Sequence, residues 1–522
     1  MPNYLTPGVY IEEIERGPRP IEGVPTSIAA FIGETDRGPT EPTLVTSYRD
    51  YQRHFGGIFA TERYLPYAVN GFFTNGGQQL FIARVVGKGA TAAFKVFGDF
   101  TLTAVGPGDS GNKVWAAIQQ STTQVPDPKT KKPVPVGFML KMAYWPVMPA
   151  DGPFDPFLPA NNALVPRPQY QEIFDDLSPD PASSNFYVKR LDNSAMLATL
   201  TRTKGVDAAG ASLPTFTSGK LDKGSDAKAG VAVADFEGDQ VSPPQGLAAL
   251  ELDSYRQVAL VHAPYPAAPA GSADVARALI DHCERLKSRF AILDPDPHQA
   301  NYSLLDPRTN IQDTQYAAYY YPWLWILDPV SDAQKLVPPG GYVTGIYART
   351  DTERGVWKAP ANETVREAID VEFDINDPAQ GVLNPLGVDV IRKFPGRGIL
   401  VWGARTLSAN GLWKYVPVRR LFIFLERSIY EGTQWVVFEP NDQKLWARVT
   451  DSIRLFLRTQ WREGALFGAT EDQAFFITCD RTTMTQDDIL NGRLICEIGI
   501  APVRPAEFVI FRIFQNTADA QH

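Results

Sequence analysis

The region from Phe394 to Phe514 constrains the fold more than any other part of the sequence, because its secondary-structure signals follow one another without an irregular interruption. Short apolar runs predict buried strands at 398–406, 434–440 and 474–479. Helical periodicity predicts a helix at 418–430 and a longer one from an N-cap at Asn441 or Asp442 to about Gly464. Helices and strands thus share one region, which indicates an α+β fold.

The same region ends in two further strand-like runs, 493–500 and 507–514, with Pro502 and Pro505 between them. In the second run both alternating faces are apolar, so a strand there needs cover on two sides. The opposite end of the chain is similar, because a strand-like run at 9–14 is followed by proline-rich spacers. We therefore expect extended N- and C-terminal arms, at 1–26 and 505–522.

A strand without a partner in its own core is completed when a neighbouring subunit adds a strand beside it. The arms are therefore expected to make inter-subunit contacts. The residues assigned to these contacts are Val9, Tyr10, Ile11, Glu12, Phe508, Val509, Ile510, Phe511 and Ile513.

The chain has 522 residues, more than one hydrophobic core usually serves, so two or three domains are expected. Apolar strand and helix patterns alternate in 27–90 and again in 245–393. The expected elements are strands at 27–33, 80–86, 258–261 and 290–293 and helices at 47–55, 64–75 and 272–290, the last capped by Ser272. Strand, helix, strand over 258–293 indicates a parallel crossover, and 27–90 with 245–393 forms a mixed α/β core domain. Residues 394–504 form the C-terminal core domain.

Between these segments, residues 91–244 are rich in Gly, Pro, Ser, Thr and Asp, with short strand-like runs at 113–119 and 137–143. This composition predicts an inserted β-rich domain, in which 204–230 is an exposed loop. Because the insert offers no long apolar face, we expect it on the outside of any assembly.

Charge and cysteine content exclude several classes of function. The net charge is −9, which disfavours nucleic acid as a partner. Cys283, Cys479 and Cys496 form no CxxC pair, and this fits a reducing compartment. The start lacks a signal-peptide pattern and no apolar run reaches the roughly 18 residues of a membrane span, so we expect a soluble protein made in the cytoplasm, without membrane insertion.

Motifs for catalysis or cofactor binding are weak, and we expect no catalytic, cofactor or metal site. Gly106 to Gly111 matches GxGxxG, but the following residues look like a strand, whereas a dinucleotide site needs a helix. The embedded Gly108-Asp109-Ser110-Gly111 resembles the nucleophile loop of trypsin-like proteases, yet the upstream His54 lies in an expected helix. A P-loop sequence is absent, because Gly87-Lys88 and Gly219-Lys220 lack its other residues. The acidic runs 235–239 and 294–297 do not have calcium-loop spacing.

The helix expected at 442–463 carries the most informative surface. At 100° per residue its apolar side chains fall in one arc of about 120° and its basic side chains in an opposing arc of similar width. The apolar set is Leu445, Val449, Ile453, Phe456 and Leu457; the basic set is Lys444, Arg448, Arg454, Arg458 and Arg462, interrupted by Asp451. A solvated helix face and an electrostatic contact with an acidic partner are both compatible with this pattern.

Several stretches together resemble contractile tail sheath proteins of phages and contractile injection systems. They are Thr6 to Glu13, Val337 to Asp351 with Gly355 to Asn362, Phe394 to Leu407, and Arg419 to Asn441. The resemblance covers about residues 1–90 and 245–515. The insert resembles the family least, in keeping with an outer domain that varies between sheaths.

The resemblance implies a structural, non-enzymatic subunit of a phage tail or contractile injection particle. Such subunits form stacked hexameric rings around an inner tube and contract to drive the tube into a target. The implied partners are other copies of the chain, the inner tube protein, and baseplate and tail-terminator proteins. The basic helix face, Lys444 to Arg462, is then expected to contact the inner tube. An alternative is a hydrolase or glycan-binding protein that acts through the inserted domain.

Overall fold

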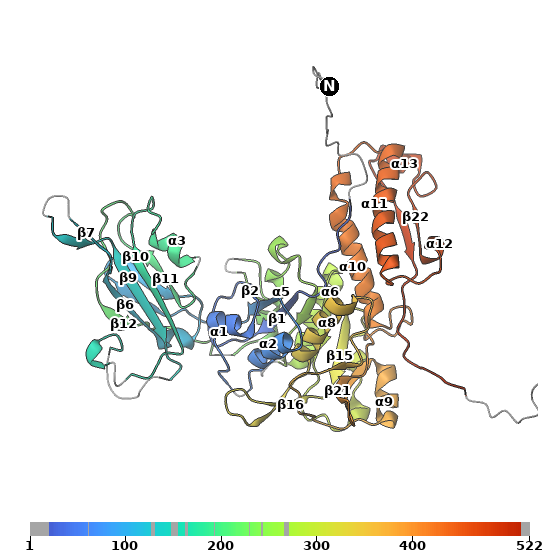
Figure 1. Cartoon of the computed structure of the whole chain (residues 1–522), viewed down its shortest axis with the longest axis horizontal. Coiled ribbons are helices and arrows are strands. Elements are labelled where there is room, and N and C mark those ends of the chain that lie inside the picture. The colour runs from blue at the N-terminus through green and yellow to red at the C-terminus, as the bar shows by residue number, and fades with distance from the viewer. Residues whose placement is uncertain are drawn as a thin grey trace, which may run out of the picture. The chain divides into compact units, whose positions relative to one another are not determined.

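A computed structural model describes residues 20–60, 62–126, 131–147, 155–161, 165–192, 194–228, 230–241, 244–265 and 271–512. The chain divides into two compact units (Figure 1). One unit combines Gly355–Lys358 with the chain from Pro417 onward and the described residues up to Val24; the other comprises Pro25–Arg354 and Ala359–Val416. The structure is a mixed α+β fold, as the sequence predicts.

A nine-stranded sheet forms the centre of the larger unit, in the order β18-β21-β20-β15-β14-β13-β1-β3-β2. The run from β20 to β3 is parallel, and the strands at both edges are antiparallel. Most residues of these parallel strands are buried, as expected when both faces of a sheet are covered. The bounds are β1 Ala29–Gly33, β2 Thr43–Val45, β3 Leu80–Arg84, β13 Leu260–His262, β14 Phe290–Leu293, β15 Ala317–Tyr321, β18 Glu363–Thr364, β20 Val388–Phe394 and β21 Gly398–Val401.

Helices cover this sheet, and two of them approach unusually closely. The helices are α1 Tyr48–Phe55, α2 Leu65–Thr74, α5 Gly246–Ala249, α6 Ser272–Leu286, α7 Pro307–Asn310, α8 Gly340–Arg354 and α9 Asp377–Leu383. A Cβ at Gly345 would lie 2.4 Å from the Phe72 carbonyl oxygen, and one at Gly71 would meet the Tyr342 ring. Glycine is therefore required where α2 crosses α8. The predicted crossover β13–α6–β14 is confirmed, but Gly271 rather than Ser272 is the N-cap of α6.

A small antiparallel sheet of three strands, β17-β16-β19, belongs to the same unit. Its bounds are β16 Leu324–Leu327, β17 Gln334–Val337 and β19 Asp370–Val371.

The segment between β3 and β13 contains two antiparallel sheets, β10-β9-β6-β12 and β11-β5-β4, around a core of its own, and a separate antiparallel pair, β7-β8. The predicted strands at 113–119 and 137–143 correspond to β6 Val114–Gln120 and β9 Phe138–Tyr144. The remaining bounds are β4 Phe94–Phe97, β5 Phe100–Ala104, β7 Gln124–Pro126, β8 Pro133–Pro135, β10 Tyr170–Leu177, α3 Tyr187–Asp192, β11 Ala198–Arg202, β12 Ser218–Lys220 and α4 Val233–Glu237. The prediction of a loop over 204–230 is partly wrong, because β12 pairs with β6 and Leu221 is buried beside it.

The two connections of this insert run side by side. A Cβ at Gly87, just after β3, would lie 2.3 Å from the Gly230 carbonyl oxygen, so the outgoing and returning chains touch and leave no room for a side chain. Such adjacent entry and exit points are typical of a domain inserted into a surface turn.

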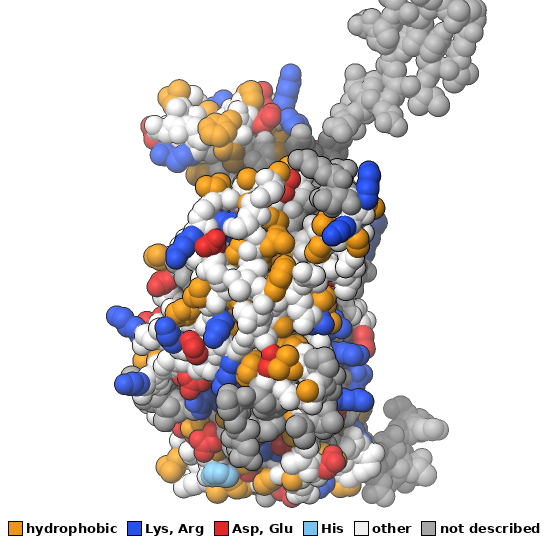
Figure 2. All heavy atoms as spheres, turned by 90° about the vertical axis from the view of Figure 1, so that its left-hand side faces the viewer, with side chains coloured by type: hydrophobic (Ala, Val, Ile, Leu, Met, Phe, Trp, Pro, Cys, Tyr) orange, Lys and Arg blue, Asp and Glu red, His pale blue; other side chains and the backbone are white. Residues whose placement is uncertain are grey.

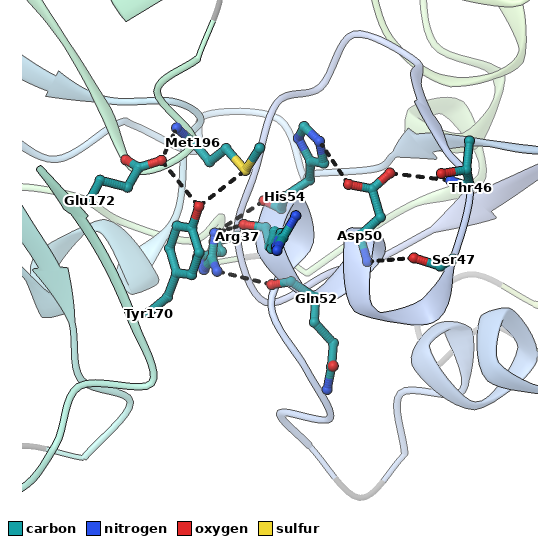
Figure 3. A network of polar contacts seen from close by, with 10 residues as sticks. Arg37, Thr46, Ser47, Asp50, Gln52, His54, Tyr170, Glu172 and Met196 are labelled. Atoms are coloured by element: carbon teal, nitrogen blue, oxygen red, sulfur yellow. Dashed lines mark hydrogen bonds and ion pairs between the residues drawn. The ribbon is translucent and has the colours of Figure 1, made fainter. Parts of the chain in front are cut away.

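Arg37 joins the insert to the helical layer of the core (Figure 3). Its guanidinium donates to the carbonyl oxygens of Gln52, Arg53 and His54, at 2.7–3.2 Å, and so satisfies the C-terminal end of α1. The same guanidinium lies over the rings of Tyr144 and Tyr170 of the insert, 5.2 and 5.3 Å from their centroids. One buried cation therefore bonds to the core and stacks on the insert.

Neighbouring polar contacts complete this junction. The Tyr144 hydroxyl donates to Asp36 at 2.7 Å, and Glu172 accepts from the backbone N–H groups of Met196 and Leu197. Arg84 donates to the Gly38 carbonyl oxygen at 2.6 Å. Because its charged groups are mostly buried and hydrogen-bonded, this junction is costly to open.

The smaller unit is built on an antiparallel helix pair, α10 Val416–Gly432 and α11 Gln443–Arg462, which lie side by side in Figure 1. The predicted N-cap is confirmed, because the Asp442 side chain accepts from the Leu445 N–H at 2.9 Å. Leu445, Val449, Ile453, Phe456 and Leu457 are all buried, as the periodicity predicts. They pack with Ile21, Val356, Leu421 and Leu425 in one core.

The strand predicted at 434–440 is wrong. Residues Gln434–Val436 form a 3-10 turn that continues from α10, and Phe438 has a positive φ of 69° and a fully exposed side chain. The apolar run serves as a short helix–helix connection, in which no strand lies alongside to hydrogen-bond with it. Apolar residues without a pairing strand do not make a sheet, whatever their propensity.

A two-stranded sheet completes this unit, formed by β22 Phe475–Thr478 and β23 Glu497–Ile500, with α12 Glu471–Ala474 and α13 Gln486–Leu490 beside it. The strand predicted at 474–479 is confirmed, and the one predicted at 493–500 is confined to its second half. Residues 503–512 form no strand in the part of the chain that the structure describes.

Replacing Arg37 with Ala is expected to lower the free energy of unfolding by about 2–4 kcal/mol, because three helix-end carbonyls lose a charged donor and two tyrosine rings lose their cation. The exposed neighbour Arg53→Ala is the matched control and should change it by less than about 0.5 kcal/mol. Urea unfolding followed by fluorescence measures both. If the two variants lower the free energy of unfolding equally, Arg37 contributes no more to stability than an exposed arginine does.

Candidate functional site

The helix α11 presents the basic side chains predicted from the sequence on its outer face. Lys444, Arg448, Arg454 and Arg462 are exposed and Arg458 is half-buried. Their backbone is fixed by the opposite face of the helix, which packs into the core of the smaller unit. The helix is therefore a rigid support for the charges, although the side chains themselves reach into solvent.

Acidic residues of the same unit occupy part of this face. Arg458 binds Glu471 of α12 through two nitrogens, at 2.6 and 3.2 Å, and Arg454 lies 3.6 Å from the same carboxylate. The Arg458 guanidinium lowers the pKa of Glu471. Arg448 lies 3.5 Å from Glu439 and over the Trp435 ring. Lys444 and Arg462, at the two ends of α11, are exposed and lie outside these ion pairs.

These ion pairs reduce the number of basic side chains on α11 that are available to a partner. Each exposed ion pair contributes about 0–1 kcal/mol, so Glu471 and Glu439 orient the arginines without neutralising the surface completely. The sequence pattern did not reveal Glu471 as a partner, since it lies beyond the turn after α11. The only feature of Glu471 visible in the sequence was a negative charge in the first turn of a short helix.

The C-terminal arm is described as far as Arg512. Phe508, Val509, Ile510 and Phe511 are between 67% and 85% exposed, and both sides of this extended segment are open to solvent. Val9, Tyr10, Ile11, Glu12 and Ile513 lie outside the described residues. The inter-subunit role of all nine residues stays a prediction.

The sheet of β22 and β23 has open backbone edges. Within the described residues each strand pairs only with the other, so each has one edge with unpaired backbone groups. A two-stranded sheet is marginal on its own, and exposed edges readily accept another strand. Phe476 on β22 is also exposed, so an added strand would find apolar surface there.

The described residues of the insert offer no comparable site. Figure 2 shows its outer face, where apolar side chains run through the middle and basic and acidic side chains are mixed along the margins. Exposed apolar residues of the insert include Val96, Ile173, Val206 and Phe216. Without a continuous patch of one charge, this face has no evident preference for a polyanion or a polycation.

Candidate catalytic residues of the insert are engaged in structural contacts. Asp109, in the sequence Gly-Asp-Ser-Gly, exchanges backbone and side-chain hydrogen bonds with Asp226. Asp109–Lys113 form a 3-10 helix, and the predicted strand begins after it, at Val114. The His54 ring lies in α1, 3.7 Å from Asp50. A protease triad needs the histidine to bond with the serine hydroxyl, and His54 is instead held by its own helix neighbour.

A buried acid–base pair lies at the carboxyl ends of β13 and β14. His262 Nδ1 contacts the Ile292 carbonyl oxygen at 2.8 Å, and Nε2 lies 3.5 Å from Asp294. Burial lowers the pKa of His262 to about 4 and raises the pKa of Asp294 to about 7. Asp294 accepts from the Gly340 and Tyr265 N–H groups, so its carboxylate closes the start of α8 rather than facing a ligand.

The other acidic runs are likewise structural. Asp235 accepts from the Ala232 N–H at the start of α4, and Asp296 accepts from the Ser272 hydroxyl. Among the described residues no group of three or more His, Cys, Asp or Glu side chains has the arrangement of a metal site. None of the described helices combines the length and apolar character needed to cross a lipid bilayer.

Comparison with known proteins identifies the family. Residues 239–407 match the phage tail sheath protein central domain, and residues 408–516 match the phage tail sheath C-terminal domain. Together the two domains account for more than half of the 522 residues.

Individual relatives agree with this match. The chain is 26% identical to a prophage major tail sheath protein of Pseudomonas aeruginosa, over 37% of this chain and 49% of that one. It is 29% identical to the tail sheath protein of Burkholderia phage BcepMu, over 28% of this chain and 33% of that one. The chain thus spans about half or less of the length of the curated relatives it matches.

Solved structures show the same fold. The contracted sheath of the extracellular contractile injection system PVC is similar with a TM-score of 0.58 and 23% identity, over 99% of both chains. The sheath tail protein of Desulfitobacterium hafniense is similar with a TM-score of 0.54 and 12% identity, over 90% of this chain and 93% of that one. With two sheath domains matched over 239–516 and the sheath fold present throughout, the chain belongs to the phage tail sheath family.

Proposed function

We propose that this protein is the structural subunit of a contractile sheath, without catalytic activity. It polymerises as stacked hexameric rings around an inner tube and contracts to drive the tube through a target envelope. Its partners are other copies of itself, the inner tube protein, and the baseplate and tail-terminator proteins of a phage tail or injection particle. It is made in the bacterial cytoplasm. The observation that carries the proposal is the match to both sheath domains over residues 239–516.

The described part of the C-terminal arm supports self-assembly. Four consecutive large apolar side chains, Phe508 to Phe511, face solvent. Burying one such side chain stabilises by about 1.5–3 kcal/mol, so covering four stabilises by roughly 6–12 kcal/mol before ordering costs. A subunit that leaves this surface open is incomplete as a monomer.

The most direct way to cover this segment is addition of a strand to the β22–β23 sheet of a neighbouring subunit. Backbone hydrogen bonds at a sheet edge then supply affinity, and alternating side chains meet apolar surface on both sides. The N-terminal residues Val9, Tyr10, Ile11 and Glu12 are assigned the same role on the sequence pattern alone.

Assembly tests the arm directly. The double variant Phe508→Asp with Ile510→Asp should remain folded, because both side chains are exposed in the subunit, but it should not form tubes. Electron microscopy measures tube formation, and circular dichroism with thermal unfolding measures the fold. Leu490→Asp is the matched control, since Leu490 is equally exposed on α13. Normal tubes from the double variant would remove the arm from the assembly mechanism.

The basic face of α11 is proposed to contact the inner tube. Ion pairs at a surface are weak, about 0–1 kcal/mol each, and are screened over roughly 8–10 Å at physiological salt. Repeated around a ring, such contacts position a tube, yet each breaks readily during contraction. Glu471 and Glu439 hold part of the face internally, which leaves Lys444 and Arg462 as the groups most available to a partner.

Charge reversal tests this contact. Lys444→Glu with Arg462→Glu should abolish extended sheath around the tube, while tube-free contracted sheath still forms. These positions avoid the Arg458–Glu471 pair, so the fold should be unaffected. Lys204→Glu with Lys220→Glu changes the net charge equally on exposed residues of the insert and should leave extended particles intact. The measurement is the fraction of extended particles in electron micrographs. If the α11 variant and the insert variant give the same fraction, the tube contact lies elsewhere on the subunit.

A further inference from the structure

Two of the three cysteines face each other across the β22–β23 sheet. The ladder ends with the pair Thr478 and Glu497. Cys479 follows Thr478 and Cys496 precedes Glu497, so the register brings the two cysteines opposite each other. Both point to the face that carries Phe475 and Ile498, where Cys479 is buried and Cys496 is partly buried in the core of the smaller unit.

The ladder pattern places this pair at a site suited to a disulfide. Ala501 donates its N–H to the Ala474 carbonyl oxygen at 2.8 Å, so Ala474 and Ala501 form a hydrogen-bonded pair. Alternation along an antiparallel ladder then makes Cys479 and Cys496 a non-hydrogen-bonded pair, whose Cα atoms lie about 4.5 Å apart. Disulfides span about 4.4–6.8 Å between Cα atoms.

The thiols already touch and are chemically different. Their side chains are hydrogen-bonded to each other, which lowers the pKa of Cys479 and raises the pKa of Cys496. Thiolates rather than thiols attack disulfides, and Cys479 is the member of the pair that lines a groove open to solvent. Cys283 is different again: it is buried in α6, and burial raises its pKa to about 12.

Cys479 is also reachable from solvent through a groove. A hollow of about 530 Å³ is lined by Trp446, Thr450 and Asp451 of α11 and by Cys479, Asp480 and Arg481 after β22. The groove carries the carboxylates of Asp451 and Asp480 as well as the guanidinium of Arg481, so its charges do not favour an anion. What it offers a small disulfide is room near Cys479.

We propose that Cys479 and Cys496 are a redox modification site, which a small-molecule disulfide of the oxidised-glutathione class converts to an intramolecular disulfide. The Cys479 thiolate attacks one sulfur of that molecule, and the other sulfur leaves as a thiolate that takes up a proton. The Cys496 thiolate, having released its proton to water, then attacks the Cys479 sulfur and displaces the second small thiol. Two protein thiols are oxidised to one disulfide, and one small disulfide is reduced to two thiols.

The bond would close a loop from 479 to 496 that contains α13, and would fix the spacing of β22 and β23. Closing a loop restricts the unfolded chain, so the oxidised hairpin is expected to open less often. In a reducing cytoplasm the pair stays as two thiols, and it oxidises once the chain meets an oxidising medium. The inference does not depend on the proposed sheath function, because it concerns the isolated subunit.

Redox titration of the purified full-length chain tests the site. The protein is equilibrated in buffers of reduced and oxidised glutathione, acid-quenched, unfolded, alkylated and analysed by mass spectrometry. Cys479 and Cys496 should lose alkylation together with one midpoint, and a cross-linked peptide should contain both residues. Cys283 should remain alkylated throughout. Independent loss at the two positions, or stable glutathione adducts in the wild-type chain, would overturn the proposal.

Two variants separate the roles of the sulfurs. Cys496→Ser should trap one glutathione on Cys479, because the displacing thiol is gone, whereas Cys283→Ser should titrate as the wild type does. The thermal midpoint should rise on oxidation in wild type and Cys283→Ser but not in Cys496→Ser. If Cys496→Ser does not fold, the wild-type titration and peptide map decide alone. A Cys496→Ser chain that gains no adduct would contradict the assignment of Cys479 as the attacking group.

Discussion

A parallel sheet buried on both faces is the constraint on which the larger unit depends. Strands such as β1 and β3 can be apolar throughout only because helices cover them, and parallel strands must be joined by crossovers. The chain leaves this sheet after β3 and returns at β13, and both of these strands flank β1. The insert is thus attached where the sheet already demands a long connection. The contact between Gly87 and Gly230 closes the insert off at its base.

Burial also determines how the insert is held. Arg37 is too costly to bury alone, and its position is stable because three carbonyl oxygens of α1 and two tyrosine rings surround it. An insert attached in this way moves with the core instead of swinging on a flexible linker.

The smaller unit shows the opposite situation, in which surface is left open. In the described residues, the apolar side chains of the arm after Pro505 are not covered by other residues, and the outer edges of β22 and β23 have no neighbouring strand. On α11 the side chains of Arg448, Arg454 and Arg458 are partly held by Glu439 and Glu471. Apolar strand addition and weak charge contacts would then serve different tasks, the first permanent and the second reversible.

The sequence alone determined the elements whose signals are local. The periodicity of Leu445, Val449 and Ile453, the Asp442 cap, the buried strands around β1 and the crossover β13–α6–β14 were all predicted, because caps and apolar spacing act within a few residues. The exposed arm at Phe508 to Phe511 was recognisable for the same reason: its two apolar faces had no visible partner. The sheath resemblance likewise rested on contiguous residues.

Tertiary structure decided whatever depends on residues far apart in the chain. Residues 434–440 have strand propensity but find no neighbouring strand, so they form a turn, whereas Ser218 to Lys220, in a loop-like sequence, become a strand because β6 offers an edge. The pairing of Arg458 with Glu471, the stacking of Arg37 on the insert and the meeting of Cys479 with Cys496 follow from register and packing. Residue spacing in the sequence does not predict those contacts, because the separation of two segments along the chain does not determine their distance in space.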